Sequence, residues 1–300
     1  MRAHEGAASL VCMTDTAIAV SGLRKTYGEL VAVADLDLEI RRGEVFALLG
    51  PNGAGKSTTV EILEGFRKRT AGDVTVLGED PQHADRAFRE RIGVMLQTTS
   101  GRSFLSAREA LHHAAKLYPH ARGVDDTLAA VGLEAKANVK PQLLSGGQRR
   151  RLDVALAVIG RPELVFLDEP TTGFDPEARR QFWRLIESLK DDGTTIVLTT
   201  HYLDEADYLA DRIGIIAQGS LVALDTPAGL RARATGAQVS WTEAGEPRTE
   251  STTTPSAFLR TLLSRHDGEI QHLEVRHPSL EDVYLDLVGL DQPALAQEAS

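Results

Sequence analysis

The sequence has 300 residues, of which 42% are hydrophobic and 25% are charged, and its formal net charge is −10 at pH 7. This composition is typical of an ordinary globular protein, and the negative charge argues against a nucleic-acid surface as the main partner. The single cysteine, Cys12, excludes an internal disulfide, and no run reaches the about 18 apolar residues needed to cross a bilayer. We therefore expect a cytoplasmic protein that, if it works at a membrane, sits on that membrane without spanning it.

Residues 1–16 are mostly small or polar and lack periodicity, so we expect them to be disordered. Their apolar run is too short for a secretory signal, and both Met1 and Met13 stay open as the start of the protein. From residue 17 to about residue 230, short apolar or β-branched runs alternate with longer helical patterns. This alternation predicts an α/β fold with a mostly parallel sheet. The expected strands are Val45–Leu49, Leu164–Leu167 and Thr195–Thr199, and the expected helices are Lys56–Phe66, Gly147–Ile159 and Pro176–Lys190.

One segment within this region departs from the alternation. Phe104–Val139 contains helical patterns without strand-like runs. We interpret it as a helical insertion into the α/β core, within a helical subdomain of about residues 100–160.

The composition changes again after residue 230. Ala237–Thr254 is rich in Thr, Glu and Ser, with Gly245 and Pro247 marking a turn. A final helix is expected to open with a capping box formed by Ser279 and Asp282. We predict that residues 231–300 form a small α+β C-terminal accessory domain, whose expected elements are a helix over Ser256–Arg265, a strand over Glu269–Arg276 and a helix over Ser279–Leu287.

The strongest motif is the segment GPNGAGKST, which fits the pattern G-x-x-x-x-G-K-[ST] between an apolar strand and a helix. Its glycines let the backbone wrap around phosphates and present N–H groups to them, and the helix adds the positive end of its dipole. We expect Lys56 to reach the β- and γ-phosphates and Ser57 to hold Mg²⁺ through its hydroxyl. The motif predicts a nucleotide site formed by Gly50, Pro51, Asn52, Gly53, Ala54, Gly55, Lys56, Ser57 and Thr58.

Two adjacent carboxylates, Asp168 and Glu169, follow the apolar run in LVFLDEP. They are expected at the carboxyl end of a buried strand, where open α/β sheets bind their ligands. In that position Asp168 would complete the Mg²⁺ shell and Glu169 would polarise the attacking water as a general base. The alternative is an exposed acidic turn, but the presence of the segment GPNGAGKST, a P-loop motif, disfavours this alternative.

The segment LLSGGQRRRLDVALAVI places Ser145, Gly146 and Gly147 at the start of a further helix. A bare helix start with outward N–H groups suits a phosphate, whereas the alternative is an ordinary capped helix start. The arginines at positions 149–151 are interpreted as a solvated helix face and not as a nucleic-acid patch.

The segment LSGGQ at residues 144–148 lies between the P-loop motif and the acidic pair, and it resembles the signature motif of the ATP-binding subunits of ABC transporters. Other segments resemble further motifs of that family, and all of them occur in the order typical of the family. Tyr27 resembles the aromatic residue that stacks on adenine, and Gln97 resembles the Q-loop glutamine, which senses Mg²⁺ and contacts the membrane partner. Asp175 in TTGFDP resembles the D-loop aspartate, and His201 resembles the switch histidine.

The resemblance extends over about residues 18–230 and implies the P-loop fold of an ABC cassette, with an antiparallel β part beside the parallel core. It implies an active ATPase that uses ATP and Mg²⁺, with Glu169 and His201 as catalytic residues. The implied Mg²⁺ ligands are Ser57, Gln97 and Asp168.

The same resemblance implies a head-to-tail homodimer that works with a separate integral membrane permease, on the inner face of the cell membrane. Each ATP would lie between the P-loop of one subunit and the signature residues of the other, namely Ser145, Gly146, Gly147 and Gln148. The C-terminal segment PSLEDVYLDLVG resembles the drug- and antibiotic-exporter branch typified by daunorubicin-resistance ATPases. A soluble ABC ATPase outside transport, for example in cluster assembly, stays open as the alternative, and a regulatory protein without turnover is disfavoured by Glu169 and His201.

Overall fold

The computed structural model describes residues 15–95, 104–233, 236–243, 245–266 and 268–289. In this part of the chain, the central sheet has six strands in the order β5-β6-β7-β3-β8-β9. All neighbouring strands are parallel except β8 and β9, which confirms the α/β class and the mostly parallel sheet. The strands are β3 (Val45–Leu49), β5 (Ile92–Met95), β6 (Leu164–Asp168), β7 (Thr195–Thr199), β8 (Arg212–Ala217) and β9 (Ser220–Asp225).

The central sheet separates two hydrophobic cores. Val45, Ala47 and Leu49 of β3 pack in one core, and the alternating Phe46 and Leu48 pack in the other. A strand that is buried on both faces must be apolar along its whole length, which is why VFALL folds as a central strand. The first core also includes residues of α6 (Pro176–Asp191), α7 (Leu203–Leu209) and the helical insertion.

A second, antiparallel sheet forms the other side of the second core. Its strands lie in the order β2-β1-β4, and the helices α1 (Lys56–Leu63) and α2 (Arg86–Arg91) contribute residues to the same core. The antiparallel part expected from the family resemblance is therefore confirmed. Its strands are β1 (Thr16–Tyr27), β2 (Leu30–Arg41) and β4 (Ala71–Val76), so regular structure begins at Thr16, inside the segment expected to be disordered, and residues 1–14 lie outside the described residues.

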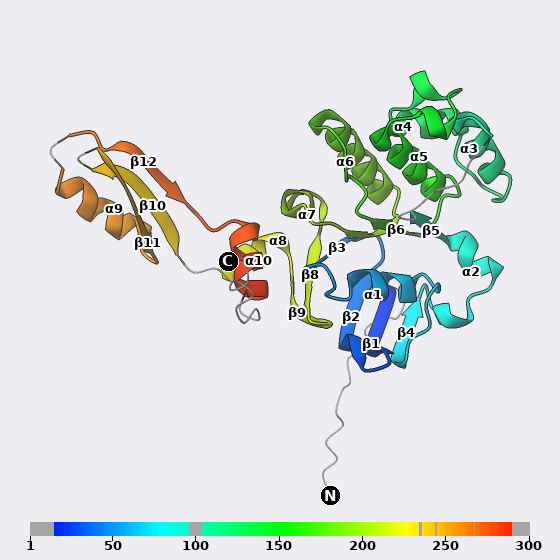
Figure 1. The fold of residues 1–300 in the computed structure, drawn as a ribbon, viewed down its shortest axis with the longest axis horizontal. Helices are drawn as coiled ribbons and strands as arrows, with labels where there is room; N and C mark the ends of the chain where they lie inside the picture. The colour runs from blue at the N-terminus through cyan, green and yellow to red at the C-terminus, as the bar shows by residue number, and fades with distance from the viewer. Residues whose placement is uncertain (1–14, 96–103, 234–235, 244, 267, 290–300) are drawn as a thin grey trace, which may run out of the picture.

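The expected helical insertion is confirmed as a group of helices between β5 and β6. Figure 1 shows α3, α4 and α5 together beyond the β5–β6 end of the central sheet. The bounds are α3 (Ala107–Ala115), α4 (Val124–Ala130) and α5 (Gly146–Val158), with 3₁₀ turns at η2 (Glu134–Lys136) and η3 (Pro141–Leu143) and an earlier one at η1 (Pro81–His83).

The C-terminal appendage has its own small sheet and core. Strands β10 (Ala237–Glu243), β11 (Glu246–Thr252) and β12 (Gln271–Arg276) pair in the order β11-β10-β12. The helix α9 (Pro255–Ser264) supplies Leu262 to a core that also contains Val239, Trp241 and Ile270. The α+β composition is as expected, but Pro247, expected at a turn, lies within β11. The strands β10 and β11 pair in an antiparallel way, which the polar residues of this segment did not indicate.

The chain returns from this appendage to the cassette. The last helix, α10 (Leu280–Gly289), lies beside α8 (Pro227–Arg233) in Figure 1, apart from the appendage sheet. Leu280 and Val283 of α10 are buried in the first core of the cassette. The expected domain boundary at residue 230 therefore falls inside α8, and the expected capping box opens α10, because Ser279 Oγ accepts from Asp282 N at 3.2 Å and Ser279 N donates to Asp282 Oδ2 at 2.8 Å.

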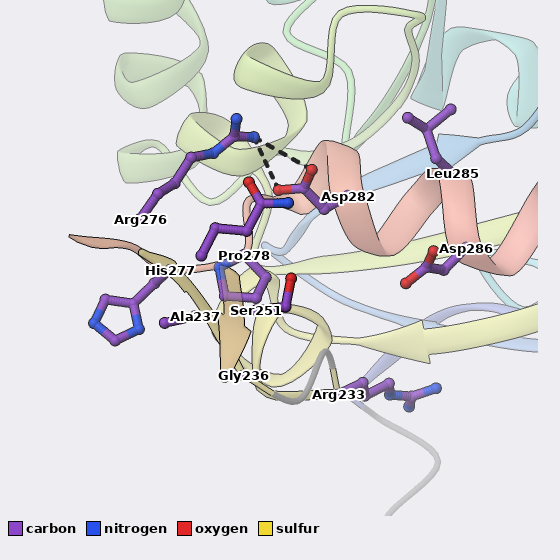
Figure 2. A pocket seen from close by; sticks show the side chains of 11 residues that line it. Arg233, Gly236, Ala237, Ser251, Arg276, His277, Pro278, Asp282, Leu285 and Asp286 are labelled. Atoms are coloured by element: carbon purple, nitrogen blue, oxygen red, sulfur yellow. Dashed lines mark hydrogen bonds and ion pairs between the residues drawn. The ribbon is translucent and has the colours of Figure 1, made fainter. Parts of the chain in front are cut away.

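A cavity of about 430 Å³ lies where the appendage meets the cassette. Figure 2 shows Arg276, at the end of β12, bonded to Asp282 on α10, with Arg276 Nη2 3.0 Å from Asp282 Oδ2. No residue that the sequence assigns to a site lines this cavity. Among the described helices, none is both long enough and apolar enough to cross a membrane.

Candidate nucleotide site

The loop between β3 and α1 passes against two other segments so closely that it requires glycine. A Cβ on Gly55, whose φ is 103°, would lie 2.4 Å from Ala32 O. A Cβ on Gly50 would lie 2.2 Å from Ile216 O. The sequence GPNGAGKST therefore packs its backbone against β2 and β8, and α1 begins directly after it at Lys56.

The Lys56 side chain lies over this loop. Its Nζ donates to Gly50 O at 2.6 Å and to Pro51 O at 3.0 Å. Burial lowers the pKa of Lys56, while the charges of Glu169 and Asp168 act in the opposite direction. The ammonium group is thus close enough to the acidic pair for their charges to interact.

Asp168 ends β6 and is held by the neighbouring strand. The parallel register pairs Asp168 with Thr199 at the end of β7, and Thr199 Oγ1 donates to Asp168 Oδ1. The hydroxyl of Ser57, exposed in the first turn of α1, is the other described oxygen donor that the sequence assigned to Mg²⁺. A carboxylate and a hydroxyl are hard oxygen ligands of the kind that Mg²⁺ prefers, so these residues fit that ion.

Glu169 combines an unusual backbone conformation with several contacts. Its φ is 47°, in the left-handed region that a non-glycine residue rarely occupies. Its N–H faces Thr199, with the N atom 3.0 Å from Thr199 O and 3.2 Å from Thr199 Oγ1. Its Oε2 lies 3.0 Å from His201 Nδ1 and accepts a hydrogen bond from Thr172 Oγ1 at 3.3 Å. The structure therefore brings the two expected catalytic residues into direct contact.

The sequence predicts a solvated face for the arginines at 149–151, and Arg149 is exposed as expected, whereas Arg150 and Arg151 are not. Arg150 Nη2 donates to the main-chain oxygens of Asp168 and, at 3.0 Å, Glu169. Arg151 Nη1 donates to Gly132 O at 3.2 Å, and both side chains are partly buried. Arg150 and Arg151 instead join α5 to the segments beside it.

The signature segment begins α5, but its start is not bare. Ser145 Oγ accepts from Gln148 N at 3.2 Å, and Gln148 Oε1 accepts from Ser145 N at 3.1 Å, which forms a capping box. The expectation of a bare helix start was wrong, because the signature serine and glutamine satisfy each other's N–H groups. A Cβ on Gly147 would lie 3.3 Å from Gly173 O, so the start of α5 also lies against the Thr171–Pro176 segment.

The other expected site residues have different surroundings. Tyr27, at the end of β1, is 40% exposed, and Lys25 Nζ lies 4.9 Å from its ring centroid. Asp175 caps α6, with its Oδ1 accepting from Ala178 N at 2.8 Å. Gln97 lies outside the described residues.

Sequence reasoning missed several residues that support this site. Thr199 ends the strand next to Asp168, a position that becomes apparent only when the strand order is known. Arg150 gave no signal, since its acceptors are main-chain oxygens. Glu205 is fully buried, and the hydroxyls of Thr200 and Thr171 lie near enough to lower the pKa of its carboxyl, although burial raises that pKa overall.

Comparison with known proteins identifies relatives of this chain. Residues 33–172 match the model of the ABC transporter family. A daunorubicin resistance ATP-binding protein of Streptomyces coeruleorubidus is 37% identical over 93% of this chain and 98% of its own length. A Nod factor export ATP-binding protein of Sinorhizobium fredii is 37% identical over 92% of this chain and 87% of its own length.

Solved structures extend over a shorter part of the chain. An ATP-binding subunit of an ABC transporter has a TM-score of 0.66 at 27% identity and covers 73% of this chain and 93% of its own. A dimeric ATP-binding cassette in a post-hydrolysis state, bound to ADP and phosphate, has a TM-score of 0.63 at 28% identity and covers 70% of this chain and 98% of its own. The larger coverage by the sequence relatives indicates that they share the appendage as well as the cassette.

Proposed function

The chain belongs to the ATP-binding subunits of ABC transporters, and on that premise we propose that it acts as a homodimer which powers the export of a drug, antibiotic or other hydrophobic compound. The observation that carries the ATPase assignment is the direct contact of Glu169 with His201, together with the Lys56 ammonium on the phosphate loop, whose pKa the charge of Glu169 influences. The export assignment rests on the daunorubicin resistance and Nod factor export relatives, which cover 93% and 92% of this chain.

We assign the chemistry to in-line attack of water on the γ-phosphate of ATP. Glu169 accepts the proton of the attacking water as its general base, and His201, 3.0 Å from Glu169 Oε2, orients that carboxylate and contacts the γ-phosphate end. Lys56 and the loop Gly50–Gly55 bind the phosphates. Tyr27 offers its exposed ring to adenine.

Mg²⁺ would be held by Ser57 and Asp168, with Gln97 as the third protein ligand assigned from the family resemblance. When bound, the ion neutralises charge on the phosphate oxygens. Thr199 contributes by fixing the Asp168 carboxylate through its hydrogen bond.

The dimer and the membrane partner complete the proposal. Ser145–Gln148 of each subunit face the nucleotide of the other, and Asp175 lies in the segment between the two sites. A separate permease holds the dimer at the inner face of the cell membrane, with the protein itself cytoplasmic. The cargo is selected by the permease.

The deciding experiment is an affinity pull-down from detergent-solubilised membranes with tagged Glu169→Gln protein and ATP. The variant should bind ATP, form a stable dimer and recover a multi-spanning membrane protein. Recovery of soluble partners alone, despite an ATP-dependent dimer, would favour an ABC ATPase outside transport. The Lys56→Ala variant, which should bind ATP at least about tenfold more weakly, is the matched control at an ATP concentration that saturates only the Glu169→Gln protein.

A further inference from the structure

Helix α5 contacts the end of β6 through one particular side chain. Arg150 lies in the second turn of α5, and its Nη2 donates to Asp168 O and, at 3.0 Å, to Glu169 O. These are the main-chain oxygens of the two carboxylate residues of the site. The guanidinium therefore holds two successive peptide groups through their main-chain oxygens.

A second contact lies on the same face of α5. Gly147 precedes Arg150 by three residues, and residues so spaced lie one above the other on a helix. A Cβ on Gly147 would lie 3.3 Å from Gly173 O and 3.7 Å from the Phe174 ring. One side of α5 is thus seated against the chain from Asp168 to Phe174, both at its signature glycine and at Arg150.

The backbone that Arg150 holds is strained. Glu169 has a φ of 47°, a conformation that costs a non-glycine residue on the order of 1–3 kcal/mol and persists only when its surroundings impose it. Thr199 constrains the Glu169 N–H, with donor–acceptor distances of 3.0 and 3.2 Å. Arg150 constrains the carbonyl, so the residue is fixed from both sides.

We propose that Arg150 is a positioning residue that links the signature helix to the backbone of Glu169 in the same subunit, so that the direction of the Glu169 carboxylate follows the position of α5. The proposal rests on the role of Glu169 as general base. Because the start of α5 is assigned to the partner's nucleotide, Arg150 gives that nucleotide a route to the catalytic carboxylate of the other site. A misplacement of about 1 Å in a catalytic group costs up to about 100-fold in rate, which sets the size of the effect.

The chemistry of the side chain matters as well as its charge. The guanidinium presents several N–H donors in a rigid plane, whereas a lysine ammonium is a compact, flexible donor group. Arg150→Lys should therefore keep part of the link, and Arg150→Ala should remove it. Arg180→Ala, which removes an exposed arginine of α6, is the matched control.

The test compares the full-length variants for kcat, for KM and for ATP binding. We expect Arg150→Ala to lower kcat about 10- to 100-fold with ATP affinity within about twofold of wild type, since no nucleotide-binding residue is changed. Arg150→Lys should lie between the two, and Arg180→Ala should match wild type. In the Glu169→Gln background, Arg150→Ala should still form the ATP-dependent dimer.

Two results would overturn the link. One is a kcat for Arg150→Ala within about threefold of wild type. The other is a parallel loss of ATP affinity and thermal stability, which would mean that Arg150 merely supports the fold. If Arg150→Ala does not fold, Arg150→Lys decides, because a wild-type kcat in that variant contradicts the requirement for the guanidinium. Wild-type protein without any ATP turnover would instead contradict the proposed function.

Discussion

His201 Nδ1 lies 3.0 Å from Glu169 Oε2, which joins the loop before α7 to the end of β6. The ring of Tyr202 stands 4.1 Å from that of His201, centroid to centroid, and Arg179 of α6 lies 4.5 Å from the Tyr202 ring centroid. The imidazole is therefore supported on one side by a chain of packed groups while it contacts the carboxylate on the other. This arrangement makes the orientation of Glu169 depend on His201.

Replacing His201 by alanine should lower kcat more than it weakens ATP binding. A positioned acid–base partner contributes about 10²–10⁴-fold to a rate, and we expect a loss at the lower end because Thr172 still donates to Glu169 Oε2 at 3.3 Å. Steady-state kinetics together with equilibrium binding of ATP measures both effects. His113→Ala, on the exposed side of α3, is the control, and a kcat for His201→Ala equal to that of the control would contradict the role.

Replacing Lys56 should have the opposite pattern to replacing His201, with the larger effect on ATP binding. Its Nζ donates to two carbonyls of the phosphate loop, and its charge is the one assigned to the β- and γ-phosphates. Lys56→Ala should therefore weaken ATP binding by at least about tenfold, the equivalent of one charge-assisted hydrogen bond of 1.5–3 kcal/mol. Titration with ATP measures this loss, and an unchanged affinity would show that the phosphates bind elsewhere.

The parts of the fold that were predictable from the sequence are the segments whose residue pattern indicates a single type of secondary structure. The runs Val45–Leu49 and Thr195–Thr199 match β3 and β7 residue for residue, because a short, wholly apolar or β-branched run is typical of a strand that is buried on both faces of a sheet. The strand β11 could not be predicted in this way, since six of its seven residues, in EPRTEST, are exposed. It forms because it pairs with β10 along its length.

The site shows a similar division. Lys56, Asp168 and Glu169 belong to local motifs whose spacing already implies their chemistry. The supporting contacts of Arg150 and Thr199 depend on which segments the fold brings together, and Arg150 binds main-chain oxygens that every residue possesses. The capping of α5 by Ser145 and Gln148 was weighed only as an alternative, because the same residues also suit a phosphate.

Glu64, just after α1, should make stability depend on pH. Burial, together with the charges of Asp168 and Glu61, raises the pKa of Glu64 from 4.5 to about 8. The folded state therefore binds this proton more tightly than the unfolded state does. Its contribution to stability is fully present below about pH 4.5 and is lost as the pH rises through 8. Glu64→Gln should accordingly flatten the fall in Tm between about pH 4.5 and pH 8.

Thermal unfolding at a series of pH values tests this prediction. The control is Glu134→Gln, which removes an exposed carboxylate in η2 and should leave the wild-type profile unchanged. A Glu64→Gln profile parallel to that of wild type would show that Glu64 is ionised in the folded protein at neutral pH.

Glu205 should tolerate glutamine far better than alanine. Its carboxyl is fully buried, and burial raises its pKa against the lowering effect of Thr200, Thr171 and Trp183. A neutral amide of the same shape fills the same buried space without a charge, whereas alanine leaves a cavity. We expect Glu205→Ala to lower the free energy of unfolding by about 2–4 kcal/mol and Glu205→Gln to change it by less than about 1 kcal/mol. Equal destabilisation by both substitutions in urea unfolding would mean that the charged form is required.

The return of α10 to the cassette predicts that the two halves of the C-terminal region have separate effects. Leu280 is 3% exposed and packs in the cassette core, so Leu280→Ala should lower the free energy of unfolding of the cassette by about 2–4 kcal/mol. Trp241 packs in the separate core of the appendage, so Trp241→Ala should unfold the appendage and leave ATP binding intact. Thermal unfolding with and without ATP separates the two, since ATP raises the Tm only of the unit that binds it. If Trp241→Ala weakened ATP binding as much as Leu280→Ala did, the appendage would be part of the same cooperative unit as the cassette.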